Sequence, residues 1–131
     1  MKYLVDTSVL IHSLSAQSKL SHRALILLAD SSSELYLSAV SSWEITIKVG
    51  TGKLKLPEKP AEFVTRAMRL MSMQALDITH LHALALDSLP NHHCDPFDRM
   101  LIAQASVEGL VLLTADRIFR KYQVEQEYCG R

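Results

Sequence analysis

Cysteine, net charge and long hydrophobic runs are all scarce in this chain, and each absence excludes a class of protein. The only two cysteines, Cys94 and Cys129, lie far apart and match neither a disulfide framework nor a paired C-x-x-C metal site. The 14 basic and 14 acidic side chains cancel, so the chain lacks the overall positive field that often marks proteins binding nucleic acid through phosphates alone. Any such contact must come from a local patch or a bound cation.

The sequence also lacks the segments that direct a chain into or across a membrane. No apolar stretch approaches the roughly 20 residues that span a bilayer. The N-terminus reaches Asp6 after a short apolar run, which leaves no room for the basic, apolar and cleavage regions of a signal peptide. Together with the scarcity of cysteine, these features predict a soluble protein of the reducing cytoplasm, with no membrane partner.

The length and composition fit a single domain. With 131 residues, of which 48% are hydrophobic, the chain can bury a core without disulfides or metals as staples. It contains no repeat, no low-complexity tract and no linker long enough to divide it. We therefore expect residues 1–131 to fold as one unit.

Short apolar runs alternate with segments of helical periodicity along the chain. This alternation predicts an α/β layer architecture with a mostly parallel sheet, in which ligand sites lie at the carboxyl ends of the strands. Strands are expected at 3–5, 35–37, 75–78 and 110–113 and around Val124, and helices at 7–14, 20–29, 41–49, 61–73, 80–86 and 97–107.

Four acidic residues fall at the ends of these predicted elements. Asp6 and Asp116 each follow an apolar strand, and Glu44 and Asp98 are expected in the first turn of a helix facing the same edge of the sheet. Four ionised carboxylates there would repel one another unless raised pKa values or a divalent cation relieve the repulsion. Oxygen ligands without matching His or Cys favour Mg²⁺ or Mn²⁺, and such an ion can promote phosphodiester hydrolysis.

Each of these acidic residues also has a structural interpretation. Asp6 and Asp116 could cap the helices that follow them. Glu44 stands three residues after Ser41, as in a capping box, and Asp98 could be a first-turn carboxylate favoured by the helix dipole. Such roles do not explain why all four residues at one edge are acidic.

Four ordered motifs carry a resemblance to a known family. They are LVDTSVL at 4–10, SAVSSWEI at 38–45, DPFDRMLIAQA at 95–105 and LLTAD at 112–116. They resemble the motifs of the PIN-domain nucleases, and within them those of the VapC-type toxins of bacterial toxin–antitoxin pairs, over nearly the whole chain. The resemblance implies a three-layer α/β/α sandwich, Mg²⁺ or Mn²⁺ in an acidic pocket, and endonucleolytic cleavage of RNA. It also implies an antitoxin that blocks the site with an inserted segment, and a homodimer that lines up two active sites.

Carried over by position, the resemblance implies a catalytic role for each of the four acidic residues. Asp6 and Asp98 match the direct metal ligands of the family's acidic quartet. Glu44 and Asp116 match its remaining members, which act through water or hold a second ion, so Asp116 is a further metal-ligand candidate.

The residues around the quartet have expected roles as well. Thr7, Ser8 and Thr114 match the small hydroxyl positions that support the acidic residues. Asp95 belongs to the Asp-Pro-Phe-Asp motif, but its position before Pro96 predicts a helix cap. Cys94 stands where the subgroup often has a basic residue, which predicts weaker phosphate contact rather than weaker metal binding.

Basic residues near the quartet are candidates for holding RNA phosphates. Arg99 and Arg117 adjoin the proposed ligands, and Lys48 begins a basic stretch that runs to Arg69 beside the Glu44 helix. For the basic stretch, a solvated helix face and loop is an equally good interpretation. Arg99 and Arg117 are better placed to hold a phosphate, with neutralisation of the neighbouring carboxylate as the alternative.

The remaining candidates are expected to be structural. The His92-His93-Cys94 loop looks like a soft metal cluster, but adjacent residues cannot easily converge on one ion. Trp43 is expected to be a packing anchor. The apolar faces of the helices at 20–28 and 63–73 could form a groove for an antitoxin helix or simply pack into the core. The other histidines are expected on helix surfaces or in an interface: His12, His22, His80 and His82.

Two other functions use the same fold. A phosphatase or phosphotransfer domain would use Asp6 as a covalent nucleophile, but enzymes of the haloacid-dehalogenase type carry a second Asp two residues on, where this chain has Ser8. A non-catalytic module would only bind RNA or a protein. An idle site, however, would not need four mutually repelling carboxylates.

Overall fold

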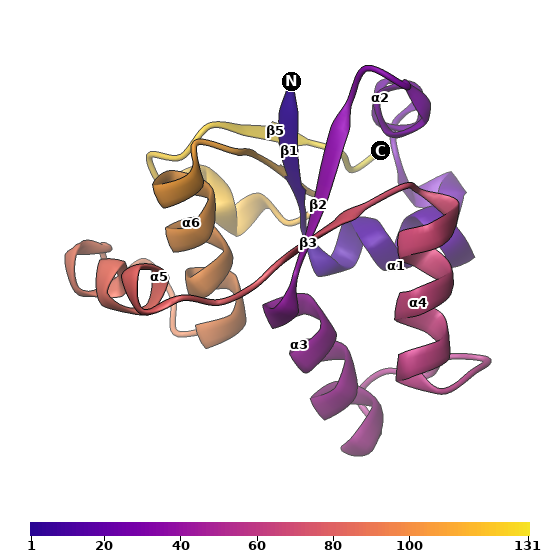
Figure 1. The fold of residues 1–131 in the computed structure, drawn as a ribbon, viewed down its shortest axis with the longest axis horizontal. Helices are drawn as coiled ribbons and strands as arrows, with labels where there is room; N and C mark the ends of the chain where they lie inside the picture. Colours follow the sequence, from indigo (N-terminus) through magenta and orange to yellow (C-terminus); the bar gives the residue numbers. More distant parts are fainter.

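The computed structural model describes residues 1–131 and contains one five-stranded sheet between layers of helices (Figure 1). All four strand pairings are parallel. The predicted α/β/α sandwich is therefore confirmed, and its sheet is fully rather than mostly parallel. The strands are β1 (Lys2–Val5), β2 (Glu34–Ser38), β3 (Gln74–Leu76), β4 (Val111–Thr114) and β5 (Gln126–Tyr128), in the spatial order β3-β2-β1-β4-β5.

Six α-helices and three short 3₁₀ segments connect the strands. The last residue of the longest helix is followed by Gly109, which adopts the left-handed conformation of a helix C-cap. The helices are α1 (Thr7–Ser15), α2 (His22–Ala29), α3 (Ala39–Gly50), α4 (Pro60–Leu70), α5 (His80–Ala85) and α6 (Pro96–Glu108), and the 3₁₀ segments are η1 (Gln17–Lys19), η2 (Leu86–Ser88) and η3 (Arg117–Lys121).

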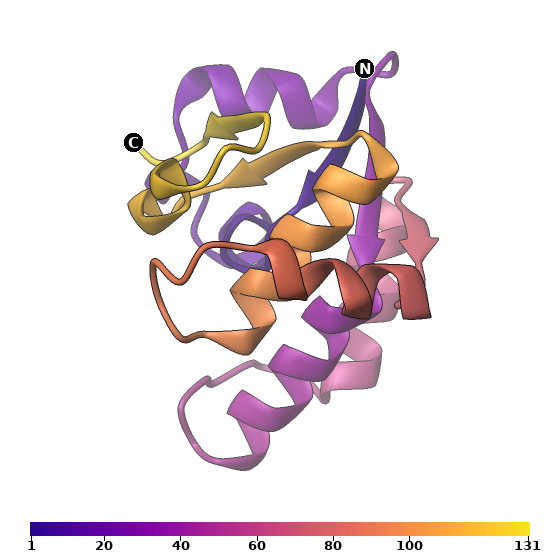
Figure 2. The same cartoon turned by 90° about the vertical axis from the view of Figure 1, so that its left-hand side faces the viewer.

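The sheet is buried on both faces, which explains why its strands are continuous apolar runs. On β1, Tyr3 and Val5 pack into one core with residues of α1, α2 and α4, whereas Leu4 packs into a second core with residues of α6 and η3. Figure 2 shows α5 and α6 in front of the sheet on this second side. The period-two alternation of the strand thus divides its side chains between the two cores.

Polar side chains are buried where α5 and α6 meet. Gln104 on α6 accepts a hydrogen bond of 2.5 Å from the Ser38 hydroxyl, and its amide lies 3.3 Å from Nδ1 of His82. His82 is almost completely buried, so the expectation that it lies on a helix surface is wrong. Its ring completes a capping box with Thr79, whose hydroxyl caps the start of α5.

Some element boundaries differ from those expected. Helix α3 begins at Ala39 because the Ser38 hydroxyl accepts a hydrogen bond from the backbone of Val40. The capping box predicted for Ser41 and Glu44 is therefore wrong, and Glu44 lies in the second turn. Val124 precedes the last strand instead of belonging to it.

Two expectations about packing also change. Trp43 is 53% exposed, and its ring makes an edge-to-face contact with Phe97 at 4.9 Å between centroids, so it is not a buried anchor. In the helices proposed to form an antitoxin groove, Ala24, Phe63 and Ala67 are buried in the first core. Core packing therefore accounts for much of their apolar character.

Neither cysteine is paired: Cys94 is exposed and Cys129 is buried. None of the helices combines the length and the apolar character that crossing a bilayer requires.

The left-handed cap at Gly109 gives a test of the α6–β4 connection. Gly109 has a φ of 66°, which costs an L-residue side chain energy even though a Cβ there would meet no other atom. We expect Gly109→Ala to lower the free energy of unfolding by about 1 kcal/mol in urea titrations. The matched control is Gly50→Ala at the end of α3, where a Cβ is also unobstructed and φ is ordinary. That variant should be neutral or slightly stabilising, and equal losses in both would contradict the assignment.

Candidate functional site

The candidate site lies beside β1, the point in the sheet at which the order of strand addition reverses. From β1 the chain builds outward through β2 and β3, and it then returns to place β4 and β5 on the other side of β1. In open parallel sheets, ligands bind outside the carboxyl ends of the strands at such a switch point. Asp6 follows β1 and Asp116 follows β4 by two residues, so both lie at this edge as the sequence predicted.

Asp6 is held rigidly at the centre of the site. Its Oδ2 accepts two hydrogen bonds of 2.8 Å, one from the hydroxyl of Ser8 and one from that of Thr114. The side chain makes no cap hydrogen bond to α1, so the structural role considered for it is absent. Burial raises the pKa of Asp6 to about 6, against the opposing effect of these two hydrogen bonds.

Asp98 enters the site from the first turn of α6. Asp95 caps this helix as predicted, because its Oδ1 accepts hydrogen bonds from the backbone N–H groups of Phe97 and Asp98. Burial, followed by the negative charges of the surrounding carboxylates, raises the pKa of Asp98 to about 8. The carboxyl of Asp98 therefore holds its proton at neutral pH unless a positive charge is nearby.

Glu44 reaches the site from α3 and is buried. One of its oxygens forms an ion pair with Lys48, one turn further along the helix. Its other oxygen, Oε1, is buried without a hydrogen-bond partner. An unpaired carboxylate oxygen in the interior is costly unless something positive binds it.

Asp116 is the most exposed member of the quartet. One of its oxygens accepts a hydrogen bond from the backbone of Ile118, so the predicted capping role is present. Its own backbone N–H donates to the Thr114 hydroxyl, which in turn donates to Asp6. Thr114 thereby links two members of the quartet, the kind of support predicted for it.

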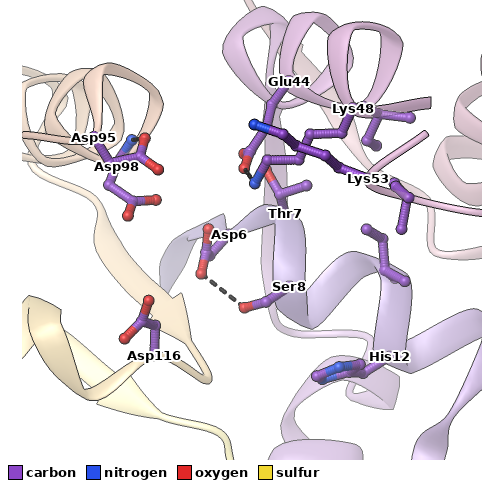
Figure 3. Close-up of a pocket in the computed structure, with 13 residues that line it drawn as sticks. Asp6, Thr7, Ser8, His12, Glu44, Lys48, Lys53, Asp95, Asp98 and Asp116 are labelled. Carbon is purple, nitrogen blue, oxygen red and sulfur yellow. Dashed lines mark hydrogen bonds and ion pairs between the residues drawn. The ribbon is translucent and has the colours of Figure 1, made fainter. Parts of the chain in front are cut away.

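These four side chains line one pocket of about 330 Å³, into which the carboxylates of Asp6, Asp98 and Asp116 point (Figure 3). The structure thus brings together acidic residues from four separate segments. Thr7 and Ser8 also line the pocket as predicted, and the Thr7 hydroxyl donates to that of Ser41 over 2.9 Å. The remaining lining residues are Ile11, His12, Ile45, Lys48, Lys53, Leu54 and Asp95.

Of the three basic residues expected to hold phosphates, only Lys48 lines this pocket. The guanidinium of Arg99 instead donates to the carbonyls of Leu89 and Pro90. That of Arg117 lies over the ring of Tyr128, 4.8 Å from its centroid. The phosphate-binding role expected for both arginines therefore has no support in their positions.

Three further residues lie in or beside the pocket, and two of them, His12 and His93, were not assigned to it from the sequence. His12 follows Ser8 by four positions, so helical spacing could have placed it on the same face of α1. Lys53 belongs to the basic stretch that the sequence offered as a phosphate guide, and it lines the pocket together with Lys48 (Figure 3). His93 approaches Asp98 from outside the pocket, with Nε2 3.3 Å from Oδ2, although its loop was considered only as a soft metal cluster.

A model of the PIN domain family matches residues 3–125, nearly the whole chain. The chain belongs to the PIN domain family. Over 53 residues, the chain is 40% identical to Ribonuclease VapC16 of Mycobacterium tuberculosis, a segment that covers 40% of this chain and 38% of that protein.

Solved structures support the same fold over the full length of the chain. One of them is VapBC2 from Rickettsia felis, bound to a DNA fragment from its promoter. It matches with a TM-score of 0.75 and 14% identity, and the match covers 99% of this chain and 100% of the VapBC2 chain. A toxin–antitoxin complex from Klebsiella pneumoniae has a TM-score of 0.58 and 21% identity, with 89% of each chain covered. At such identities the likeness establishes the PIN fold alone.

The donor set of the PIN-domain pocket fits a hard divalent cation. Carboxylates predominate among its metal-ligand candidates, with His12 the one histidine in the lining, and the buried, unpartnered Oε1 of Glu44 is one oxygen that such an ion could satisfy. As the side chains stand, no three His, Cys, Asp or Glu residues form a ready cation cage. Binding therefore requires at least one of the four carboxylates to move toward the others.

The raised pKa of Asp98 makes the stability of the metal-free protein depend on pH. In the unfolded chain this carboxyl ionises near 3.8, whereas in the folded protein it ionises near 8. Between these values the unfolded state releases a proton that the folded state keeps, so a rise in pH favours unfolding. The stability that the protonated Asp98 carboxyl gives the folded state is fully present below about pH 4, and it is lost as the pH rises through about 8.

We predict that Asp98→Asn raises the free energy of unfolding at pH 8 by at least about 1 kcal/mol, because the folded state no longer has to hold a carboxyl that resists ionisation and even one pKa unit corresponds to about 1.4 kcal/mol. It should also flatten the decline in stability above about pH 6, where Asp6 has already ionised. Urea unfolding in the presence of a chelator measures both effects. Asp87→Asn, which removes an exposed carboxyl on η2, is the control and should change neither. An Asp98→Asn protein with the full pH dependence of the wild type would contradict this account of the pocket.

Proposed function

We propose that this chain is a Mg²⁺- or Mn²⁺-dependent endoribonuclease and the toxin of a toxin–antitoxin pair. The observation that carries the proposal is the meeting of Asp6, Glu44, Asp98 and Asp116 in one pocket of a PIN domain. The name of the VapC16 relative, a ribonuclease, supports RNA as the substrate.

Asp6, Asp98 and Asp116 are the proposed metal ligands, and Glu44 completes the acidic quartet. A bound divalent ion would polarise the phosphodiester, lower the pKa of an attacking water and stabilise the leaving oxygen. The role of the chain is to hold the ligand oxygens in place. Ser8 and Thr114 both donate to Oδ2 of Asp6, which leaves its Oδ1 free to face the ion.

Lys48 and Lys53 are proposed to guide RNA phosphates into this negative pocket. Both line it, and Lys48 is held by its ion pair with Glu44. Their positive charge offsets part of the repulsion that a phosphate would meet from four carboxylates. The phosphate contact proposed for the site therefore comes from α3 and the loop after it.

An antitoxin and a second copy of the chain are the proposed protein partners. The Klebsiella pneumoniae structure, a toxin–antitoxin complex, supports the first. Exposed apolar side chains on α3 and α5 provide a surface that could contact the second copy. They are Trp43, Ile47, Leu81 and Leu84. A cytoplasmic location, where RNA and a newly made antitoxin are both present, is part of the same proposal.

The proposal is tested by RNA cleavage with the purified protein. We expect cleavage with Mg²⁺ or Mn²⁺, none with excess chelator, and a loss of at least about 100-fold in Asp6→Asn, because a charged ligand of the ion that stabilises the transition state is removed. Asp87→Asn keeps the pocket intact and should cleave like the wild type. Equal cleavage by the wild type, by Asp6→Asn and with chelator would point to a contaminating nuclease or another site.

The role of Lys48 is tested by RNA binding in the inactive Asp6→Asn background. We expect Lys48→Ala to weaken the binding of a single-stranded RNA by about tenfold, equivalent to about 1.4 kcal/mol. The slope of log affinity against log salt should fall by about 0.7, because one phosphate contact is lost. Lys55→Ala removes an exposed charge that does not line the pocket and should change binding much less. Equal effects of the two variants would show that only the overall charge matters.

A further inference from the structure

A chain of polar contacts runs behind Asp98, on the side away from the pocket. Nε2 of His93 lies 3.3 Å from Oδ2 of Asp98, and Nδ1 of the same ring lies 2.7 Å from the hydroxyl of Tyr122. Nη1 of Arg99 lies 3.3 Å from that hydroxyl. The loop before α6, the first turn of α6 and the residue after η3 thus meet at one histidine ring.

The members of this chain are fixed by the surrounding structure. Arg99 is anchored by its hydrogen bonds to the carbonyls of Leu89 and Pro90. Tyr122 is only 4% exposed, and the His93 ring packs edge-on against it. The ring therefore has little freedom to turn away from Asp98.

The direction of the hydrogen bonds follows from the chemistry of the end groups. A guanidinium can only donate, so the Tyr122 oxygen accepts from Arg99. When Asp98 is ionised, as a metal ligand is, its Oδ2 can only accept, so Nε2 of the neutral His93 ring carries the proton and Nδ1 accepts from the Tyr122 hydroxyl. That N–H points at Oδ2 of Asp98, and it is a favourable partner for an ionised carboxylate.

We propose that His93 is a positioning residue that holds Asp98 in its metal-binding orientation, with Tyr122 and Arg99 fixing the ring and its tautomer. By occupying Oδ2, the His93 N–H turns Oδ1 of Asp98 toward the ion. This inference rests on the proposed function, because it assumes that Asp98 is a metal ligand. Outer partners of this kind commonly contribute 10- to 100-fold to metal affinity.

Neighbouring residues of the same loop lack this role. His92 is exposed, and its ring packs edge-on against Tyr122 with 4.9 Å between the ring centroids. Cys94 is exposed as well. His92→Ala is therefore a matched control that alters the loop without removing a hydrogen bond to the quartet.

The test is Mn²⁺ binding to the full chain by titration calorimetry, with thermal unfolding to verify folding. We expect His93→Ala to bind Mn²⁺ about 10- to 100-fold more weakly than the wild type. His93→Gln should recover most of the affinity, because its amide can still donate to Asp98. Tyr122→Phe should show a smaller loss, since the ring contact stays while the hydroxyl that orients His93 is removed. In RNA cleavage, raising the Mn²⁺ concentration should restore most of the rate of His93→Ala.

The outcomes separate this inference from the proposed function. If the wild type binds Mn²⁺ and His93→Ala binds it equally well, the role of His93 is overturned while the proposed function stands. A folded His93→Gln protein as impaired as His93→Ala would also overturn it, as would equal losses in His92→Ala. If His93→Ala does not fold, Tyr122→Phe decides, and unchanged Mn²⁺ affinity in that variant counts against the proposal. A wild type that binds no Mn²⁺ would overturn both proposals.

Discussion

Mutual repulsion among carboxylates at one edge of the sheet is the constraint around which this PIN domain is built. The repulsion is visible in Asp98, whose pKa is raised to about 8 by burial and by the surrounding acidic side chains. Folding that brings these groups together costs free energy, which other contacts must offset. A positive charge bound at this edge of the sheet would lower that cost.

Much of the local structure serves to hold these carboxylates in place. The parallel sheet brings the ends of β1 and β4 side by side, and the Thr114 hydroxyl joins Asp6 to the backbone of Asp116. The cap at Asp95 fixes the first turn of α6, from which Asp98 projects. Each contact is weak by itself, but together they restrict a set of groups that would otherwise move apart.

The sequence was sufficient for the features that depend on periodicity and strand ends. Apolar runs ending at Asp6 and Asp116 predicted both the parallel sheet and the edge where these residues meet. The burial of His82 and the exposure of Trp43 could not be predicted, because they depend on which neighbours α5 and α3 meet in space. The contact of His93 with Asp98 was missed for a similar reason, since it depends on the path of a loop without periodicity.

The central claim is that the acidic pocket exists to bind a divalent cation between side chains from four segments. The most direct measurement is a crystal structure of the protein grown with Mn²⁺, with the anomalous scattering of the metal used to locate it. The account predicts a peak in the pocket, in contact with oxygens of Asp6 and Asp98. A pocket without a peak at saturating Mn²⁺, or a metal bound only elsewhere on the surface, would contradict it.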